Sequence, residues 1–170
     1  CGLTDLDACF FHSGNNGTGV FLTGRTGGRQ HCHTLDVFRK NSGKAVACFS
    51  LEMSAEQLVS RLLSSEAMVD SRALRSGQIS NEDWKKLGDA AMRLSKMNIL
   101  IDDTAGITVT GIKSKLRRVE NLGFVVIDYL QLMHSAKRTD NRVQEVSEIT
   151  RSLKIMAKEL NVPVMVCAQL

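Results

Sequence analysis

The segment that most constrains the fold is residues 124–127, four consecutive apolar residues that end at Asp128. Because no polar residue alternates with the apolar ones, the segment predicts a strand that is covered on both faces, as in a parallel sheet flanked by helices. A carboxylate at the carboxyl end of such a strand lies in the crevice where open α/β sheets bind ligands. In nucleotide-hydrolysing domains this carboxylate holds the Mg²⁺ that bridges the phosphates. The segment alone leaves a second interpretation open, a buried strand that ends in a capping aspartate.

Strands and helices alternate regularly from residue 45 onward. Apolar runs predict strands at residues 45–51, 99–101 and 162–168, and Gly123 predicts the turn before the strand at 124–127. Helix starts are marked by Ser54, which forms a capping box with Gln57, and by Ser80, which precedes Glu82 and Asp83. A basic amphipathic helix is predicted at residues 108–119 and a long helix at 143–160. The alternation predicts an α/β fold with a mainly parallel sheet flanked by helices.

Apolar residues recur along these helices at the three- and four-residue spacing of a buried face. They are Leu58, Leu62 and Met68, then Trp84, Leu87, Ala91 and Leu94, and finally Val143, Val146, Ile149, Leu153, Met156 and Leu160. For Trp84, the spacing favours the core or a subunit contact over a stacking platform for nucleic acid.

Composition excludes several classes of protein. With 170 residues, 43% hydrophobic and 24% charged, the chain has the size and composition of one globular domain. No run reaches the roughly 18 apolar residues of a membrane span, and no secretory signal opens the chain, so we expect a cytoplasmic location and no membrane partner. The five cysteines are scattered and predict no disulfide framework. The adjacent His31, Cys32 and His33 lack a second ligand pair, so we expect no metal there.

A set of ordered segments resembles the bacterial replicative DNA helicases of the DnaB family. IDYLQLM at residues 127–133 is similar to the Walker B segment of that family, and the other segments are FSLEMS at 49–54, IDDT at 101–104, EVSEI at 145–149, LNVPV at 160–164 and AQL at 168–170. The resemblance is nearly free of gaps from Ala45 to Leu170. It implies a RecA-like P-loop NTPase core and a ring-forming motor domain for the ATP-dependent unwinding of duplex DNA at replication forks.

The resemblance assigns roles to polar residues that follow three of the predicted strands. It implies that Asp128 coordinates Mg²⁺, that Glu52 orients and deprotonates the water that attacks the γ-phosphate of ATP, and that Gln169 senses the γ-phosphate. From the residues alone, Glu52 also fits a helix-entry carboxylate ahead of the Ser54 cap. Only its position after the last strand singles out Gln169. ATP and Mg²⁺ are the expected cofactors.

Residues 134–142 are polar and basic without periodicity, which predicts a loop. In this family the loop after Walker B faces the central channel of the ring, so Lys137, Arg138 and Arg142 are candidates for contacts with the phosphates of single-stranded DNA. The loop has no aromatic residue, so stacking on bases is not expected. A homohexamer, primase and a helicase loader are the further partners that the resemblance implies.

Before residue 45 the resemblance nearly fails. Residues 8–40 are rich in Gly, His, Asn and Phe and have neither helical nor strand periodicity, where the family has a strand, a phosphate loop and a helix. A phosphate loop needs glycines, a Lys that reaches the β and γ oxygens, and a Ser or Thr hydroxyl that binds Mg²⁺. The candidate nucleotide-binding residues are Gly24, Gly27, Gly28, Arg29 and Gln30, but an Arg is bulkier than the Lys and a Gln has no hydroxyl.

Residues 8–40 are therefore either a degraded phosphate-loop region or, over roughly 9–38, a frame-shifted reading. Codons compatible with Gly27 to His33, when read two bases later, spell Gly-Lys-Thr-Ala-Leu-Pro. Together with an Arg-Pro from the codons of Thr23 to Arg25, they restore R-P-x-x-G-K-T-A-L, the kind of phosphate loop that the family carries. A sequencing error or a pair of compensating indels would produce this pattern.

Three functions fit these patterns. The first is the helicase motor domain, and the second is a RecA-like ring or DNA-binding relative that cannot hydrolyse ATP. The third, a RecA/RadA-type recombination ATPase, would share Asp128 and Gln169 but not the SLEM and DYLQLM segments. The resemblance also implies a partial domain over residues 1–170, because the family's second DNA loop, arginine finger, primase-binding domain and linker helix have no counterpart in the sequence.

Overall fold

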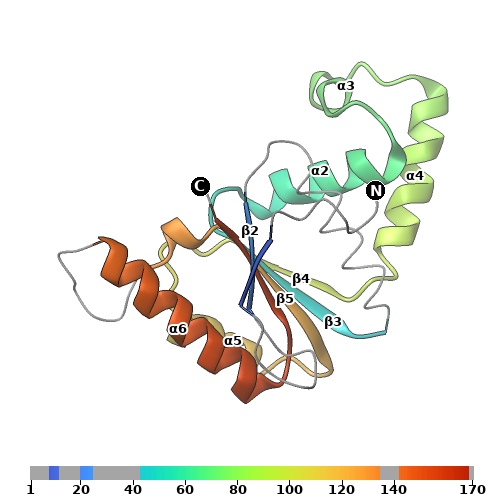
Figure 1. Cartoon of the computed structure of the whole chain (residues 1–170). Helices are drawn as coiled ribbons and strands as arrows, with labels where there is room; N and C mark the ends of the chain where they lie inside the picture. Colours follow the sequence, from blue (N-terminus) through green and yellow to red (C-terminus); the bar gives the residue numbers. More distant parts are fainter. Residues whose placement is uncertain (1–7, 12–19, 25–42, 135–141, 169–170) are drawn as a thin grey trace.

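A six-stranded sheet with helices on both faces forms the centre of the molecule (Figure 1). The computed structural model describes residues 8–11, 20–24, 43–134 and 142–168. The strands are β1 (Ala8–Phe11), β2 (Val20–Gly24), β3 (Ala45–Ser50), β4 (Ile99–Asp102), β5 (Leu122–Asp128) and β6 (Val164–Ala168). Their order is β1-β2-β6-β5-β3-β4, and every neighbouring pair is parallel except β1 and β2. The predicted α/β fold with a mainly parallel sheet is confirmed.

Two helical layers enclose the sheet. One face carries α5 (Val109–Leu116) and α6 (Arg142–Leu160), and the other carries α2 (Ala55–Ala67) and α4 (Asn81–Leu94), with the short α3 (Ser71–Ser76) next to α2 (Figure 1). A short 3-10 helix, η2 (Leu130–Leu132), follows β5.

The predicted apolar run at residues 124–127 lies in β5 and is covered on both faces of the sheet. Val125 and Ile127 belong to the core cluster under α5 and α6, which also contains Leu153. Val126 belongs to the cluster under α2, together with Leu58. Side chains of neighbouring residues point to opposite faces of a strand, so a strand with helices on both sides needs apolar residues throughout.

The predicted helix starts are confirmed by their caps. The Ser54 hydroxyl accepts a hydrogen bond from the Gln57 amide at 3.3 Å at the start of α2. The Ser80 hydroxyl accepts one from the Asp83 amide at 3.1 Å at the start of α4. Each cap satisfies an amide that has no partner inside its own helix.

The predicted buried face of α2 is right for Leu58 and Leu62 and wrong for Met68. The helix ends at Ala67, and Met68 is its C-cap in the left-handed conformation, with φ of 57°. Its side chain is 91% exposed. The chain leaves the helical path at this residue, so the helical spacing no longer predicts which way the side chain points.

The predicted face of α4 is right for Leu87 and for Leu94, which packs against the cluster under α2, and wrong for Trp84 and Ala91. Leu87 and Ala90 are buried and pack in a cluster with α2 residues, whereas Trp84 is 59% exposed and Ala91 is exposed. Trp84 is therefore not a core residue. Because few residues of α4 are buried, part of the apolar face of the helix is exposed to solvent.

The buried face of α6 begins later than predicted. Ile149, Leu153 and Met156 are buried, but Val143 in the first turn is exposed. The remaining two predicted residues, Val146 and Leu160, are partly buried against the same cluster.

Gly123 lies inside β5, so the prediction of a turn there is wrong. The left-handed residue of this connection is Asn121, with φ of 53°. A Cβ atom on Gly123 would lie 2.6 Å from the Cβ of Lys44, which is too close for any side chain. The glycine is required by the close approach of the neighbouring segment and not by a turn.

Two strands lie within residues 8–40, where the sequence showed no strand periodicity. β1 and β2 pair antiparallel, and β2 pairs parallel with β6 from Val20 to Gly24. Strand pairing uses main-chain groups that any residue except Pro supplies, so side-chain periodicity is not its only signal.

No helix within the described residues is long and apolar enough to cross a membrane.

Candidate nucleotide-binding site

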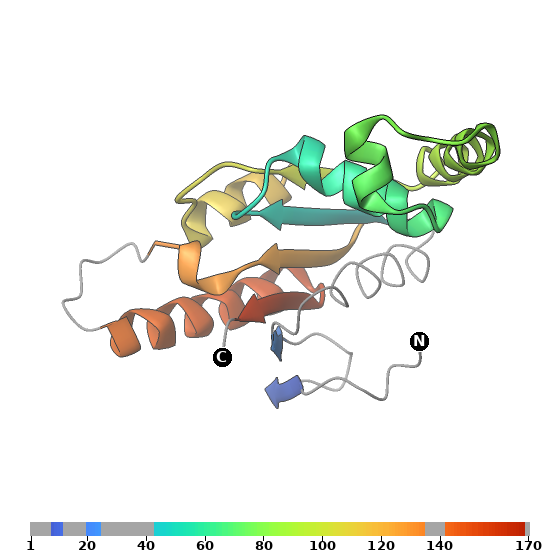
Figure 2. The same cartoon turned by 90° about the horizontal axis from the view of Figure 1, so that it is seen from above.

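The carboxyl ends of four parallel strands meet at one edge of the sheet. Asp128 at the end of β5 pairs with Ser50 at the end of β3 on one side and with Cys167 of β6 on the other. Gly24 at the end of β2 pairs with Ala168 at the end of β6. Figure 2 shows β3, β5 and β6 side by side and pointing the same way. The segments that follow these strands therefore start from one row, which we call the carboxyl edge.

Asp128 lies at the centre of the carboxyl edge. Its main-chain carbonyl accepts a hydrogen bond from the Leu51 amide at 2.7 Å, which ties the end of β5 to the residue after β3. Its carboxylate lies close enough to Cys48 to influence the thiol. Burial raises the pKa of the Cys48 thiol to about 12, and repulsion by Asp128 adds to the increase. Cys48 is therefore a neutral thiol at physiological pH and is no nucleophile.

Glu52 lies in the bend between β3 and α2 and is exposed. It comes two residues after Ser50, which is the register partner of Asp128. Asp128 thus ends β5, and Glu52 follows the end of the neighbouring strand β3. A carboxylate in an exposed bend at this edge has access to water and to a bound ligand.

Two further carboxylates lie at the end of the edge strand β4, of which Asp102 is the last residue and Asp103 the next. The Asp102 carboxylate accepts hydrogen bonds from the Thr104 amide and from the Lys115 ammonium group. Burial alone would raise the pKa of Asp102, but these hydrogen bonds outweigh burial and lower the pKa below its ordinary value. The Asp103 carboxylate accepts a hydrogen bond from the Ala55 amide at 2.9 Å. Neither residue is among the predicted site residues, although both lie in the IDDT segment at residues 101–104.

Several predicted site residues lie outside the described residues. They are Gln169, Gly27, Gly28, Arg29, Gln30, Lys137 and Arg138. Four predicted site residues are described. Glu52 and Asp128 are placed above, Gly24 ends β2 and Arg142 begins α6, and for the last two the description is limited to the main chain. The His31, Cys32 and His33 cluster also lies outside the described residues.

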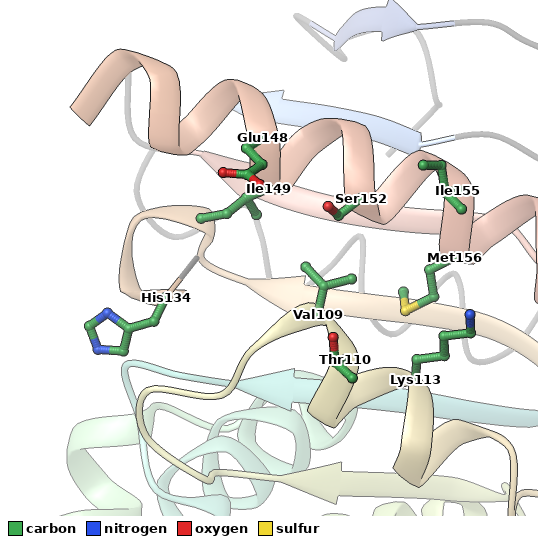
Figure 3. A pocket seen from close by; sticks show the side chains of 9 residues that line it. All are labelled: Val109, Thr110, Lys113, His134, Glu148, Ile149, Ser152, Ile155 and Met156. Carbon is green, nitrogen blue, oxygen red and sulfur yellow. The ribbon is translucent and has the colours of Figure 1, made fainter. Parts of the chain in front are cut away.

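A pocket of about 190 Å³ lies between α5 and α6 (Figure 3). Its lining residues are Val109, Thr110, Lys113, His134, Glu148, Ile149, Ser152, Ile155 and Met156. The Lys113 ammonium group is already paired with the Glu159 carboxylate. None of the predicted site residues lines this pocket. Its residues come from two helices and a loop, so no sequence motif could have indicated it.

Comparison with known proteins identifies the family. The sequence model of the DnaB-like helicase C-terminal domain matches residues 1–170. The chain belongs to this family. The replicative DNA helicase DnaB of Rickettsia bellii is 40% identical over 185 aligned positions, which cover 99% of this chain and 37% of that protein. The DnaB of Nostoc sp. strain PCC 7120 is 56% identical over 130 residues, which cover 74% of this chain and 15% of that protein.

Solved structures share the fold. A DnaB-like replicative helicase, solved for its interactions with primase, aligns with a TM-score of 0.70 at 36% identity, over 75% of this chain and 32% of that one. A separately solved ATPase domain aligns with a TM-score of 0.79 at 32% identity, over 89% of this chain and 56% of that one. The chain thus spans 15% and 37% of the two curated relatives named above.

Proposed function

We propose that this chain is part of a ring-forming motor domain that uses ATP to unwind duplex DNA at replication forks. The observation that carries the proposal is the carboxyl edge, where Gly24, Asp128 and Ser50 end parallel strands of one sheet and Glu52 follows at once. Ligands of open α/β sheets bind at this edge. Membership of the DnaB-like helicase family adds the chemistry, because the curated relatives are replicative DNA helicases.

Asp128 fits a Mg²⁺ site that is completed by the nucleotide. Carboxylate oxygen is the hard donor that Mg²⁺ prefers, and Mg²⁺ in such sites uses one or two carboxylates with phosphate oxygens and waters. Within the described part of the chain, no group of three or more His, Cys, Asp or Glu side chains could hold a metal ion. This agrees with a metal whose other ligands come from ATP. When bound, the ion would neutralise charge on the phosphates.

Glu52 is the proposed general base, and Gln169 the proposed sensor of the γ-phosphate. The Glu52 carboxylate would accept the proton of the attacking water, which is the role that a carboxylate near a transferred phosphoryl group can perform. The sequence after β6 begins with Gln169, and β6 separates β5 from β2 in the sheet. An amide at this place would lie between the phosphate loop and the Mg²⁺ site.

Residues 24–30 are the proposed phosphate loop, in altered form. Gly24 is the last residue of β2, and Gly27, Gly28, Arg29 and Gln30 follow it in the sequence. We propose that residues 8–40 derive from a phosphate-loop region, either by degradation or by a frame-shift over roughly residues 9–38. The underlying nucleotides decide between the two, because codons that yield Gly-Lys-Thr in no reading frame exclude the frame-shift.

The proposed DNA contacts are two residues that precede α6 in the sequence and the first residue of that helix. Lys137, Arg138 and Arg142 would bind the phosphates of a single strand inside the channel of a homohexamer, without preference for sequence. A solved relative is described by its interactions with primase, which supports primase as a partner. A helicase loader and a cytoplasmic location complete the proposal.

Restoring the phosphate loop tests the proposed site. The variant replaces the residues around 24–33 with R-P-x-x-G-K-T-A-L and includes Arg29→Lys and Gln30→Thr. We expect Mg²⁺-dependent ATP binding by calorimetry in this variant and none in the chain as written, because the loop and its Lys supply most of the phosphate contacts. The matched control carries Arg29→Ala in the same restored loop and should lose binding. A restored chain that folds, as judged by circular dichroism, but binds no Mg-ATP would overturn the site.

A second candidate is a relative that cannot hydrolyse ATP, and Arg29 and Gln30 as written favour it. Such a protein would keep the fold and join a ring or bind DNA without turnover. The two candidates separate on the nucleotide sequence, where a Lys-Thr pair in a second reading frame supports the motor and its absence supports the inactive relative.

A further inference from the structure

The bend that carries Glu52 is fastened on both sides. The Ser50 hydroxyl donates a hydrogen bond of 2.8 Å to the main-chain oxygen of Met53, so the residues before and after the bend are joined. Ser50 is only 3% exposed, and Met53 packs in the core cluster under α2. The Leu51 amide donates to the Asp128 carbonyl at 2.7 Å. The main chain on either side of Glu52 therefore has little freedom to move.

A second fastening comes from a distant part of the chain. The Asp103 carboxylate accepts a hydrogen bond of 2.9 Å from the Ala55 amide, in the first turn of α2. The Ser54 cap satisfies the Gln57 amide, so Asp103 satisfies a different amide of the same turn. A carboxylate at a helix start also interacts favourably with the helix dipole. The connection after β4 thus holds the start of α2, three residues beyond Glu52.

A hydrogen-bonded turn orients Asp103 toward the Ala55 amide. The Asp102 carboxylate accepts a hydrogen bond from the Thr104 amide at 3.0 Å, which closes the turn. Lys115 of α5 donates to the Asp102 carboxylate and, at 2.9 Å, to the Thr104 hydroxyl. The residues on both sides of Asp103 are thereby anchored to a helix on the opposite face of the sheet.

We propose that Ser50 and Asp103 are positioning residues that hold Glu52 in place for catalysis. The inference rests on the proposed role of Glu52 as general base. A base acts only within hydrogen-bond reach of its proton, and a displacement of about 1 Å costs roughly 100-fold in rate. Glu52 lies in an irregular bend, so its placement depends on the hydrogen bonds at the two ends of that bend.

The chain contains matched controls for both residues. Ser64 is also a buried serine, and its hydroxyl donates to the main-chain oxygen of Val69 at 2.6 Å, away from the carboxyl edge. Asp70 also caps a helix, since its carboxylate accepts from the Arg72 amide at 2.8 Å at the start of α3. Ser64→Ala and Asp70→Ala remove hydrogen bonds of the same kinds as Ser50→Ala and Asp103→Ala.

The first measurement uses nuclear magnetic resonance of the full chain and needs no ATPase activity. In Ser50→Ala and Asp103→Ala we expect a shifted and broadened Glu52 amide signal, and an Ala55 amide that exchanges with solvent about fivefold faster in Asp103→Ala. Asp103→Asn keeps an acceptor oxygen at the same place and should restore the signal. The two controls should leave Glu52 unchanged. An unchanged Glu52 signal in Asp103→Ala would overturn the proposal, and this exposed position decides the matter even where Ser50→Ala fails to fold.

The second measurement uses ATP turnover by the complete protein with the restored phosphate loop, because no turnover is expected while Arg29 and Gln30 are in place. We expect Ser50→Ala and Asp103→Ala to lower kcat about tenfold with KM within twofold of the parent, since positioning acts on the chemical step. Ser64→Ala and Asp70→Ala should change neither constant. An equal loss of kcat in the controls would contradict the proposal, because it would show that Ser50 and Asp103 affect turnover only through the stability of the fold. Glu52→Gln separates the two proposals, because intact turnover in that variant defeats the proposed base while the magnetic resonance result still reports on positioning.

Discussion

Residues 45–168 and residues 8–40 contribute to the same sheet, yet their sequences carry very different information. In the first region apolar runs, helix caps and buried faces mostly agree, and β5 is buried on both faces as its apolar run requires. In the second region β2 aligns with β6 although the sequence has no strand periodicity. The described backbone thus continues the parallel sheet into a region whose side chains give no sign of it.

The difference separates the requirements of a strand from those of a phosphate site. A parallel strand needs main-chain amides and carbonyls, which almost any residue provides. A phosphate loop needs one Lys and one small hydroxyl at fixed positions, and the written chain has Arg29 and Gln30 instead. Strand pairing would therefore tolerate the change of sequence that we propose for residues 8–40, although the chemistry of a phosphate loop would be lost.

The largest expected effect concerns ATP hydrolysis by the chain as written. We predict a rate no higher than background, because the proposed phosphate loop has Arg29 and Gln30 where a Lys and a Thr are required. Phosphate release under multiple-turnover conditions provides the measurement. Hydrolysis that is sustained by this chain and abolished by Asp128→Asn would show that residues 8–40 retain the chemistry after all.

The next effect tests the region from residue 45 onward. Ile127 is fully buried in β5, and Ile127→Ala should lower the free energy of unfolding by about 2 to 5 kcal/mol through lost contacts and a cavity. Met68→Ala is the control, because Met68 is 91% exposed and its loss should cost no more than about 0.5 kcal/mol. Urea unfolding followed by circular dichroism measures both. Equal effects would mean that β5 is not the centre of the core.

The sequence was most informative where one local signal decided the structure. Ser54 and Ser80 predicted helix starts correctly, because a cap depends on residues within one turn. The Asp128 strand was also correct, since burial on both faces leaves a continuous apolar run.

The failures occurred where distant parts of the chain decided the outcome. Whether Trp84 or Ala90 is buried depends on how α4 rotates against α2, and helical spacing does not define that angle. The hydrogen bond from Ala55 to Asp103 joins residues 48 positions apart, so no local pattern could reveal it. The prediction of a turn at Gly123 is wrong because the glycine is required by the side chain of Lys44, which lies too close for a Cβ at position 123.

A smaller effect is expected from Gly123→Ala. The new Cβ would lie 2.6 Å from the Cβ of Lys44, so the strand or the preceding segment must shift, at a cost of about 1 to 3 kcal/mol in the free energy of unfolding. Gly88→Ala in α4 is the matched control. Nothing lies within 4 Å of the Cβ that it would add, and Ala in a helix is favoured over Gly by up to about 1 kcal/mol. The midpoint temperature of thermal unfolding should therefore fall for Gly123→Ala and rise for Gly88→Ala. A higher midpoint for Gly123→Ala would contradict the packing of Lys44 against β5.

The smallest effect concerns the pH dependence of the turn after β4. Hydrogen bonds from Lys115 and Thr104 lower the pKa of Asp102 below its ordinary value of 3.8. A carboxylate with a lowered pKa in the folded state contributes stability above the unfolded pKa, and this contribution disappears as the pH falls through the folded pKa. Asp102→Asn should therefore lower the free energy of unfolding near pH 7 by only a few tenths of a kcal/mol, because solvent screens the pair. Below the folded pKa the two proteins should become equally stable.

The measurement is a series of urea unfolding curves from pH 7 to pH 2 for both proteins. If the difference in the free energy of unfolding between the two proteins grows as the pH falls, its sign is wrong for a carboxylate whose pKa is lowered. That result would contradict the proposed stabilisation of the β4–α5 contact by the pair of Lys115 and Asp102. The same link holds the turn that places Asp103 against α2. The pH series on Asp102→Asn therefore tests one of the interactions that hold the bend with Glu52 in place.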